Sequence, residues 1–237
     1  MSDAADTASG LCAPPPTGPD IAGRGLDAFL RLLPARGWRA AGLREVARDT
    51  LGDDGAPVPF GAFYRVYPSK VALVAAFLAR IDDAVLAGSA PSLDPDETVR
   101  DRLFDIMMRR YDALAPYRDA VAALVDGLAR DPLTALALVR PLSRSMAIVL
   151  EDAGVSSEGG LGALRQKALA ALHLSLLRTW LNDDSADLAK TMAALDKGLK
   201  RLGRWADVIE STRKRAIFRR RERPAKDAPA AAGDAPV

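Results

Sequence analysis

Cysteine, histidine and aromatic residues are scarce in this chain of 237 residues. Cys12 is the only cysteine, His173 is the only histidine, and aromatic residues make up 5% of the sequence. A single cysteine excludes an internal disulfide and is typical of a reducing compartment. One histidine among leucines and one cysteine near the N-terminus do not assemble a histidine-based nucleophilic triad or an ordinary zinc site. We therefore expect no enzyme, no metal site and no cofactor.

Long apolar stretches, strand patterns and phosphate-binding loops are also missing. No stretch approaches the roughly 18 uninterrupted apolar residues of a membrane span. Asp3 and Asp6 stand where a signal peptide carries Lys or Arg. Alternating β-branched residues never extend far enough for a strand, and Gly159-Gly160 is a loop rather than a phosphate-binding motif. These absences predict an all-α, cytoplasmic protein.

Residues that favour helices dominate what is present. Hydrophobic residues amount to 49% and charged residues to 27%, the balance of a folded globular protein. Alanine and leucine abound, and both lose little conformational freedom in a helical turn. Apolar residues recur at helical spacing, so we expect helices at about 20–36, 41–50, 60–66, 69–85, 94–114, 132–154, 161–181 and 186–203, with another opening at Pro116.

Clear start and stop signals accompany several of these helices. Ser69 and Ser185 are expected N-caps. Asp94-Pro95 and Asp131-Pro132 each combine an N-cap with a proline at the first helical position. Gly37 is the expected stop of the first helix. The turn formers of residues 88–94 then mark a boundary between a small N-terminal domain, 20–88, and a larger one, 94–204.

Charged residues are unevenly placed along the chain. Residues 200–226 hold eleven Lys or Arg and three Asp or Glu, a local net charge of +8 in a chain of net charge +2. Trp205, Val208, Ile209, Thr212 and Ala216 fall on one face of a basic helical extension, which precedes a flexible tail within 205–237; residues 1–19 form a flexible leader. Such a helix could make a peripheral contact with an anionic membrane, or add non-specific affinity for DNA phosphates. The third alternative is a charged segment that is simply exposed to solvent. The pairs Asp53-Asp54, Asp82-Asp83 and Asp183-Asp184 are interpreted as solvating or capping groups.

One compact motif points to a family. The run Gly61-Ala62-Phe63-Tyr64-Arg65-Val66-Tyr67-Pro68-Ser69-Lys70, preceded by Gly37-Trp38 and by Leu43-Arg44-Glu45-Val46-Ala47, resembles the DNA-binding head of TetR-family transcriptional regulators. The resemblance covers about a quarter of the chain. It implies a three-helix helix-turn-helix head on a larger helical body, and a recognition helix that carries Tyr64 and Arg65 toward a DNA groove. Ser69 and Lys70 would then form a phosphate site at the next helix N-terminus. The candidate DNA-binding residues are Arg44, Gly61, Ala62, Tyr64, Arg65, Tyr67 and Lys70; the alternative is that the polar ones are helix-end residues of a packed corner.

The same segment departs from the TetR pattern at two places. Residues 51–59 lengthen the connection to the recognition helix by roughly six residues, whereas a tight turn there normally sets the angle of that helix to the groove. Ala41 and Gly42 stand where the family usually offers a hydroxyl to a phosphate. Both departures bear on DNA affinity rather than on the fold.

Two other segments of the chain resemble a second family with the same fold. The segments Leu33-Pro34-Ala35-Arg36-Gly37-Trp38 and Thr179-Trp180-Leu181-Asn182-Asp183-Asp184-Ser185 resemble the accessory lipid-binding proteins of ubiquinone biosynthesis. That resemblance implies a degenerate helix-turn-helix, a bound isoprenoid-type lipid and a C-terminal helix that docks on membranes. The two resemblances therefore leave two functions open. The first is a ligand-responsive transcriptional regulator, which we expect to act as a repressor. The alternative is a non-enzymatic lipid-binding accessory protein.

The larger domain carries the expected ligand and dimer contacts. The TetR resemblance implies a homodimer formed by residues 161–181 and 186–203, which would bring two heads onto one double-stranded operator. Methionine adapts to bulky apolar ligands, and His173 is either a polar ligand contact or a core histidine. The candidate lining of an apolar small-molecule or lipid pocket is Met107, Met108, Tyr111, Met146, Leu150, His173, Leu177 and Trp180; each is alternatively an ordinary core residue.

Overall fold

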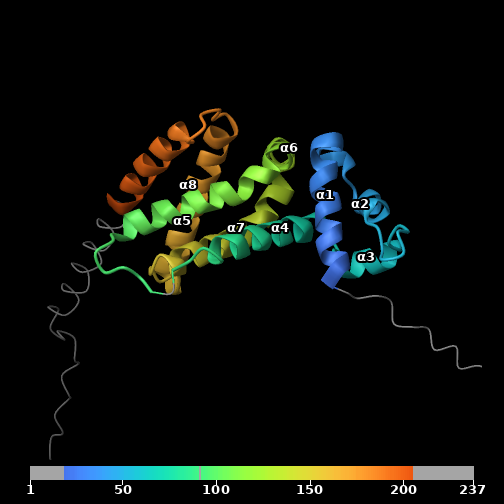
Figure 1. The fold of residues 1–237 in the computed structure, drawn as a ribbon, viewed down its shortest axis with the longest axis horizontal. Coiled ribbons are helices and arrows are strands. Elements are labelled where there is room, and N and C mark those ends of the chain that lie inside the picture. The colour runs from blue at the N-terminus through green and yellow to red at the C-terminus, as the bar shows by residue number, and fades with distance from the viewer. Residues whose placement is uncertain (1–18, 91, 205–237) are drawn as a thin grey trace, which may run out of the picture.

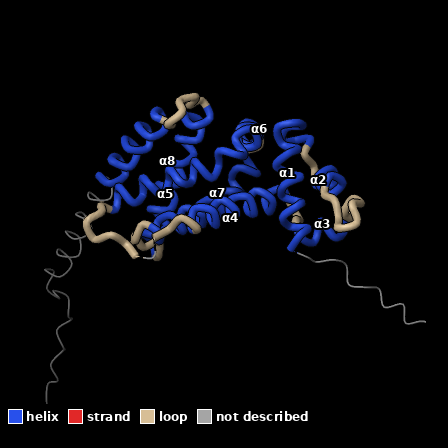
Figure 2. Tube along the Cα trace, viewed as in Figure 1, coloured by secondary structure: helices blue, strands red, loops and turns tan. Residues whose placement is uncertain are grey.

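The computed structural model describes residues 19–90 and 92–204, and these are folded into helices (Figure 1). The labelled α-helices are α1 (Pro19–Ala40), α2 (Leu43–Asp49), α3 (Phe60–Val66), α4 (Lys70–Leu86), α5 (Val99–Leu114), α6 (Arg118–Ala129), α7 (Pro132–Asp152) and α8 (Gly159–Leu181), with a 3₁₀ turn η1 at Ala115–Tyr117. A last helix covers residues 189–204. Within the described part, extended pairing is limited to one isolated bridge between Leu51 and Pro57 (Figure 2). The predicted all-α fold is confirmed.

The helices pack around one continuous core. In Figure 1, α1, α2 and α3 lie at one end and α5, α7, α8 and the last helix form the larger mass. α1 packs mainly against α6, while α4 packs mainly against α7 and α5 and only in part against α1. A single cluster of buried hydrophobic side chains extends from Ile21 to Leu199. We call residues 20–88 the head and 94–204 the body. The helix α4 joins the two, because it follows α3 in the chain and packs on α5 and α7 of the body.

The N-caps of α4 and α7 agree with their sequence signals. The Ser69 hydroxyl accepts a hydrogen bond from the backbone N–H of Ala72 at 3.1 Å. The Asp131 carboxylate accepts one from Thr134 N at 3.2 Å. Each satisfies an N–H that has no partner within its own helix. α1 breaks at Gly37, as predicted, because φ is 76° there, a backbone conformation that favours glycine.

The predicted start of α5 at Asp94 is wrong. Asp94 uses its carboxylate to accept the N–H of Asp96, two residues on, which closes a turn instead of opening a helix. The helix begins at Val99, and its N-cap is Thr98, whose hydroxyl accepts from Asp101 N at 3.2 Å. A proline after an aspartate is compatible with both outcomes, so the local signal did not distinguish them.

The last helix starts from a different cap than expected. Ser185 does accept the N–H of Ala189, at 3.0 Å. The deeper acceptor is Asp183, which receives the backbone N–H of Thr191 at 2.8 Å and its hydroxyl at 2.7 Å. Hydrogen bonds from Ser185 and then Thr191 hold the pKa of Asp183 well below its usual value. From the sequence, we interpret the three acid pairs as solvating or capping groups, and Asp183 of the pair Asp183-Asp184 is a capping group.

Among the described residues, one helix is long and apolar enough to cross a membrane by length and composition. This helix is α7, whose best window has a mean hydropathy of 1.5 and is 28% buried. Its charged residues before the last turn are Arg140 and Arg144. Core helices pass the same test, and α7 packs on α4 and α8, so this property alone does not indicate a membrane span.

Candidate nucleic-acid interface and body core

The helix-turn-helix unit consists of α2 and α3, which bury one face and expose the other. Val46 and Ala47 of α2 and Phe63 of α3 are buried in the head. Because both helices are short, the packing of these side chains holds them more than their own hydrogen bonds do. Of the predicted DNA-binding set, Arg44, Gly61, Tyr64 and Arg65 are exposed.

The exposed side chains form a basic and aromatic group. The guanidinium of Arg44 lies 4.5 Å from the centre of the Phe60 ring, and the Phe60 and Tyr64 ring centres are 5.6 Å apart. Tyr64 is 48% exposed. Arg65 follows on the same short helix. A guanidinium and a phenol at these positions are able to donate hydrogen bonds to phosphates or base edges.

Two predicted DNA contacts lie inside the head instead. Ala62 and Tyr67 are buried. The Tyr67 hydroxyl donates to the backbone carbonyl of Ala22 at 2.7 Å, and burial raises the pKa of this phenol. Tyr67 therefore ties the end of α3 to α1 and does not present its hydroxyl to DNA. The sequence motif shows that an aromatic residue stands at this position, but it does not show whether the ring points into the head or toward solvent.

Lys70 is also turned away from the expected phosphate site. Its ammonium donates to the carbonyls of Trp38, at 2.5 Å, and Arg39, at 3.3 Å. It lies 4.8 Å from the centre of the Trp38 ring, and burial lowers its pKa. A cation on the last carbonyls of a helix is favourable. In this structure Lys70 caps the end of α1 and joins it to the start of α4.

The lengthened connection between α2 and α3 is ordered. Val58 N donates to Thr50 O at 2.8 Å, and Gly52 N donates to Ala56 O at 2.7 Å. Asp53 forms an ion pair of 2.9 Å with Arg24 of α1. The extra residues therefore fold back on themselves, and Val58 anchors them in the core. The N-cap residue of α2, Gly42, provides no side-chain cap, as expected from the missing hydroxyl.

The eight candidate ligand-lining residues lie in the body core. All except Met108 are buried, and Met108 is half-buried. Three of them form a group: the Tyr111 hydroxyl lies 3.2 Å from His173 Nδ1, and the Tyr111 and Trp180 rings are 5.8 Å apart. The structure thus brings side chains of α5 and α8 into contact in the core.

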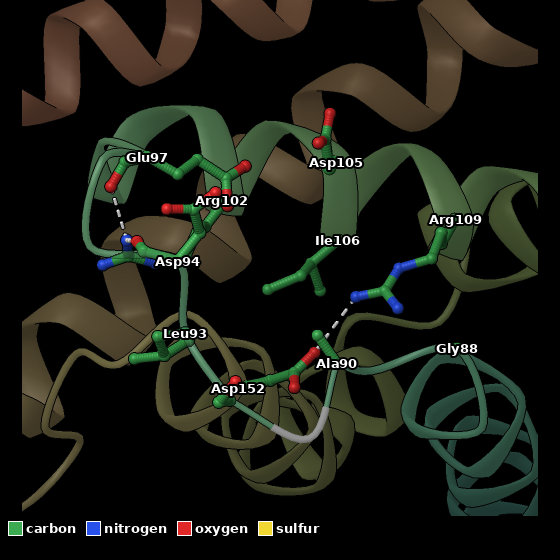
Figure 3. Close-up of a pocket in the computed structure, with 11 residues that line it drawn as sticks. Gly88, Ala90, Leu93, Asp94, Glu97, Arg102, Asp105, Ile106, Arg109 and Asp152 are labelled. Atoms are coloured by element: carbon green, nitrogen blue, oxygen red, sulfur yellow. Dashed lines mark hydrogen bonds and ion pairs between the residues drawn. The ribbon is translucent and has the colours of Figure 1, made fainter.

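A cleft of about 330 Å³ lies elsewhere, between the loop that follows α4, the helix α5 and the C-terminal end of α7 (Figure 3). Figure 3 shows Arg109 reaching Asp152, at 3.2 Å, and Arg102 on the carbonyl of Glu97, at 2.6 Å. None of the eight predicted residues lines it. Its lining residues are Gly88, Ala90, Ser92, Leu93, Asp94, Glu97, Arg102, Asp105, Ile106, Arg109 and Asp152. Among the described residues, no group of three or more His, Cys, Asp or Glu is placed to hold a metal ion.

A buried polar cluster between α4, α5 and α7 was not predicted. Arg110 of α5 is 0% exposed and pairs with Asp82 of α4 at 2.5 Å. Ser145 of α7 donates to the same carboxylate oxygen at 2.5 Å. The interpretation of Asp82 as a solvating group is therefore wrong, because this side chain joins three helices inside the protein. The only sign of this cluster in the sequence is the position of Arg110, which falls on the apolar stripe of α5.

His173 makes the folding free energy depend on pH. Burial, and then the positive charge of Arg110, lower the pKa of His173 well below its usual value. The unfolded chain takes up a proton below about pH 6.5, whereas the folded protein does not. Stability is therefore fully present above that pH, and it falls by up to about 1.4 kcal/mol per pH unit below it.

Urea unfolding at several values between pH 7.5 and pH 5 measures this effect. His173→Gln keeps a polar partner for Tyr111 but does not titrate in this range. We expect the variant to show a smaller loss of stability on acidification than the parent protein. Equal losses in the two proteins would show that His173 is not the responsible group.

Comparison with known proteins supports the fold but not a sequence family. No protein-family model matches the chain. A comparison with curated proteins also gives no match. Among solved structures, the fold is similar to a TetR transcriptional regulator from Nitrosomonas europaea ATCC 19718, with a TM-score of 0.58, 20% identity, and coverage of 76% of this chain and 97% of that one. It is also similar to a TetR transcriptional regulator from Rhodococcus sp. RHA1, with a TM-score of 0.54, 20% identity and coverage of 77% and 95%. The chain has a TetR-like fold.

Proposed function

We propose that this protein is a TetR-like, DNA-binding transcriptional regulator. The observation that carries this proposal is the exposed group of Arg44, Tyr64 and Arg65 on a helix-turn-helix whose opposite face is buried. Both solved structures with a similar fold are described as transcriptional regulators. We infer no catalytic role for any residue, and we place the protein in the cytoplasm, where its DNA lies.

The mode of DNA recognition follows from symmetry. We propose a homodimer formed by α8 and the last helix, because Leu164 and Leu174 of α8 are 47% and 52% exposed and would be covered by a second copy. Two heads would then read two half-sites about 34–36 Å apart on a palindromic operator. An apolar ligand among the buried residues around Tyr111, His173 and Trp180 would regulate binding by shifting the distance between the heads, and repression is the expected outcome.

Replacing Arg44 and Arg65 together by alanine tests the DNA interface. Each arginine contributes about 1–3 kcal/mol if it contacts a base, and less if it contacts a phosphate. We therefore expect the Arg44→Ala/Arg65→Ala variant to bind its operator about 30-fold more weakly or worse. Duplexes selected from a randomised pool would first define the operator, and fluorescence anisotropy at physiological salt would then measure affinity.

The matched control removes two arginines from the body. Arg140 and Arg144 are exposed on α7, and the Arg140→Ala/Arg144→Ala variant should keep operator affinity although it loses the same charge. Equal losses in the two variants would mean that only non-specific phosphate attraction is being measured. Selection of no preferred sequence at all would rule out the regulator.

A lipid-binding accessory protein is the second candidate. It is favoured by the position of Lys70, whose ammonium is held by the carbonyls of Trp38 and Arg39 instead of facing a phosphate, and by the ordered extra residues 51–59 beside the recognition helix. Organic extraction of the purified protein distinguishes this function. A co-purifying isoprenoid together with no sequence-specific DNA binding would establish it. The predicted basic helix of residues 205–216 lies outside the described residues.

A further inference from the structure

The outer side of α7 exposes large aliphatic side chains in a row. Leu133 is 80% exposed, Leu136 is 70% exposed and Val139 is 45% exposed. Residues three apart are neighbours on the surface of a helix, so Leu136 lies beside both Leu133 and Val139. The opposite side of α7 contains Leu138, Leu142, Met146 and Val149, which are buried, because α7 packs there on α4 and α8.

Exposed positive charges accompany this row. Arg140 and Arg144 lie one and two turns beyond Leu136 and are exposed, as is Arg130 just before the helix. From Pro132 to Leu150, α7 contains no acidic residue. Asp131, at its start, is engaged by Trp38 at 3.2 Å and by Thr134 at 2.8 Å. The surface formed by Leu133, Leu136, Val139, Arg140 and Arg144, here called the α7 face, is therefore apolar and basic.

The combination of leucines and arginines on the α7 face indicates which kind of partner covers it. Nucleic acid would bind the arginines through its phosphates, but it would not cover the exposed leucines, because leucine side chains gain nothing from contact with phosphates. A second copy related by a two-fold axis would bring the same face of each protomer together, so that arginines of like charge would meet. An anionic lipid surface matches both features, since leucine side chains enter the boundary between headgroups and acyl chains while arginines reach up to the phosphates.

We propose that the α7 face docks the folded protein on anionic membrane surfaces. The helix lies in the plane of the interface, with Leu133 and Leu136 inserted and Arg140 and Arg144 on lipid phosphates or carboxylates. Few side chains are inserted, so the contact is weak and reversible, and it depends on both apolar burial and charge. This inference does not rest on the proposed DNA binding, which uses a different surface of the molecule.

Co-sedimentation of the full chain with vesicles tests the proposal. We expect binding to phosphatidylcholine vesicles that contain phosphatidylserine and little binding to phosphatidylcholine alone. The Leu133→Ser/Leu136→Ser variant should bind at least about tenfold more weakly, since each leucine loses the stabilisation that insertion provides. The Arg140→Ala/Arg144→Ala variant should also bind about 30-fold more weakly, because each cation near the surface contributes about 1 kcal/mol. Raising the salt concentration should weaken the binding of the parent protein.

A matched control substitutes two other exposed leucines. Leu51 and Leu93 are each 50% exposed and are not part of the α7 face, and Leu51→Ser/Leu93→Ser should leave vesicle binding unchanged. All variants keep the basic residues 200–226, so full binding by Leu133→Ser/Leu136→Ser would show that another part of the chain binds lipid and would overturn the proposal. A change in oligomeric state of that variant without a change in vesicle binding would overturn it too, in favour of a second copy.

A fluorescent label places the contact on the helix itself. In a Cys12→Ser/Leu136→Cys variant, an environment-sensitive dye at position 136 should shift its emission to the blue when anionic vesicles are added. The same dye on a Cys12→Ser/Leu51→Cys variant should not shift. A shift at position 51 alone would place the contact on the head and contradict the proposal. The Arg44→Ala/Arg65→Ala variant, deficient in DNA binding, should bind vesicles normally.

Discussion

Replacing Asp82 by alanine lowers the free energy of unfolding by about 3–5 kcal/mol, because it leaves Arg110 charged, buried and without its carboxylate. Arg110 is 0% exposed, and among the described residues two of its nitrogens, Nε and Nη2, already lack a hydrogen-bond partner. Asp82 also accepts from Ser145, so the substitution leaves a second buried donor unsatisfied. Urea unfolding followed by circular dichroism measures the loss.

The neighbouring residue provides the control for this prediction. Asp83 follows Asp82 on α4 but is exposed, so Asp83→Ala should change stability by less than about 0.5 kcal/mol. Removing both charges with Asp82→Leu/Arg110→Met should recover much of the lost stability, because no unpaired charge is then buried. If Asp82→Ala were no more destabilising than Asp83→Ala, Arg110 would have to reach water or another partner in the folded protein.

Adding one methyl group at Gly127 destabilises the contact between the head and the body by about 1–3 kcal/mol. A Cβ atom built at this position lies 2.1 Å from Cβ and 2.6 Å from Cγ of Trp38. Trp38 is buried and its indole N–H donates to Asp131, so the ring has little freedom to move aside. The expected loss opposes the helix propensity of alanine, which alone would favour Gly127→Ala by about 1 kcal/mol.

A second glycine separates these two effects. A Cβ at Gly23 of α1 has no atom within 4 Å, so Gly23→Ala should stabilise the protein by up to about 1 kcal/mol through helix propensity. Thermal unfolding of both variants measures the difference. Because α1 packs mainly on α6, Gly127→Leu should also increase proteolysis of the head at low protease concentration. Equal stabilisation of the Gly127→Ala and Gly23→Ala variants would contradict the close packing of α6 on Trp38.

Part of the candidate DNA interface was predictable because its signals are local. The Gly61 to Lys70 motif places Tyr64 and Arg65 on one short helix, and Ser69 caps the helix that follows, as the structure confirms. The orientation of Tyr67 and Lys70 was not predictable. Each is engaged by a carbonyl of α1, that of Ala22 for Tyr67 and that of Trp38 for Lys70, far away in sequence.

The amino-acid sequence by itself determined which segments become helices and that the fold is all-α. Apolar periodicity, Ser69, Gly37 and Asp131-Pro132 act over three or four residues, within one turn of helix. Only the tertiary structure decided which polar groups are buried. Asp82, Arg110 and Ser145 are separated by dozens of residues and meet only when α4, α5 and α7 pack. The exposed leucines of α7 follow the same rule, because burial depends on which side of a helix its neighbours cover, and periodicity within one helix does not specify those neighbours.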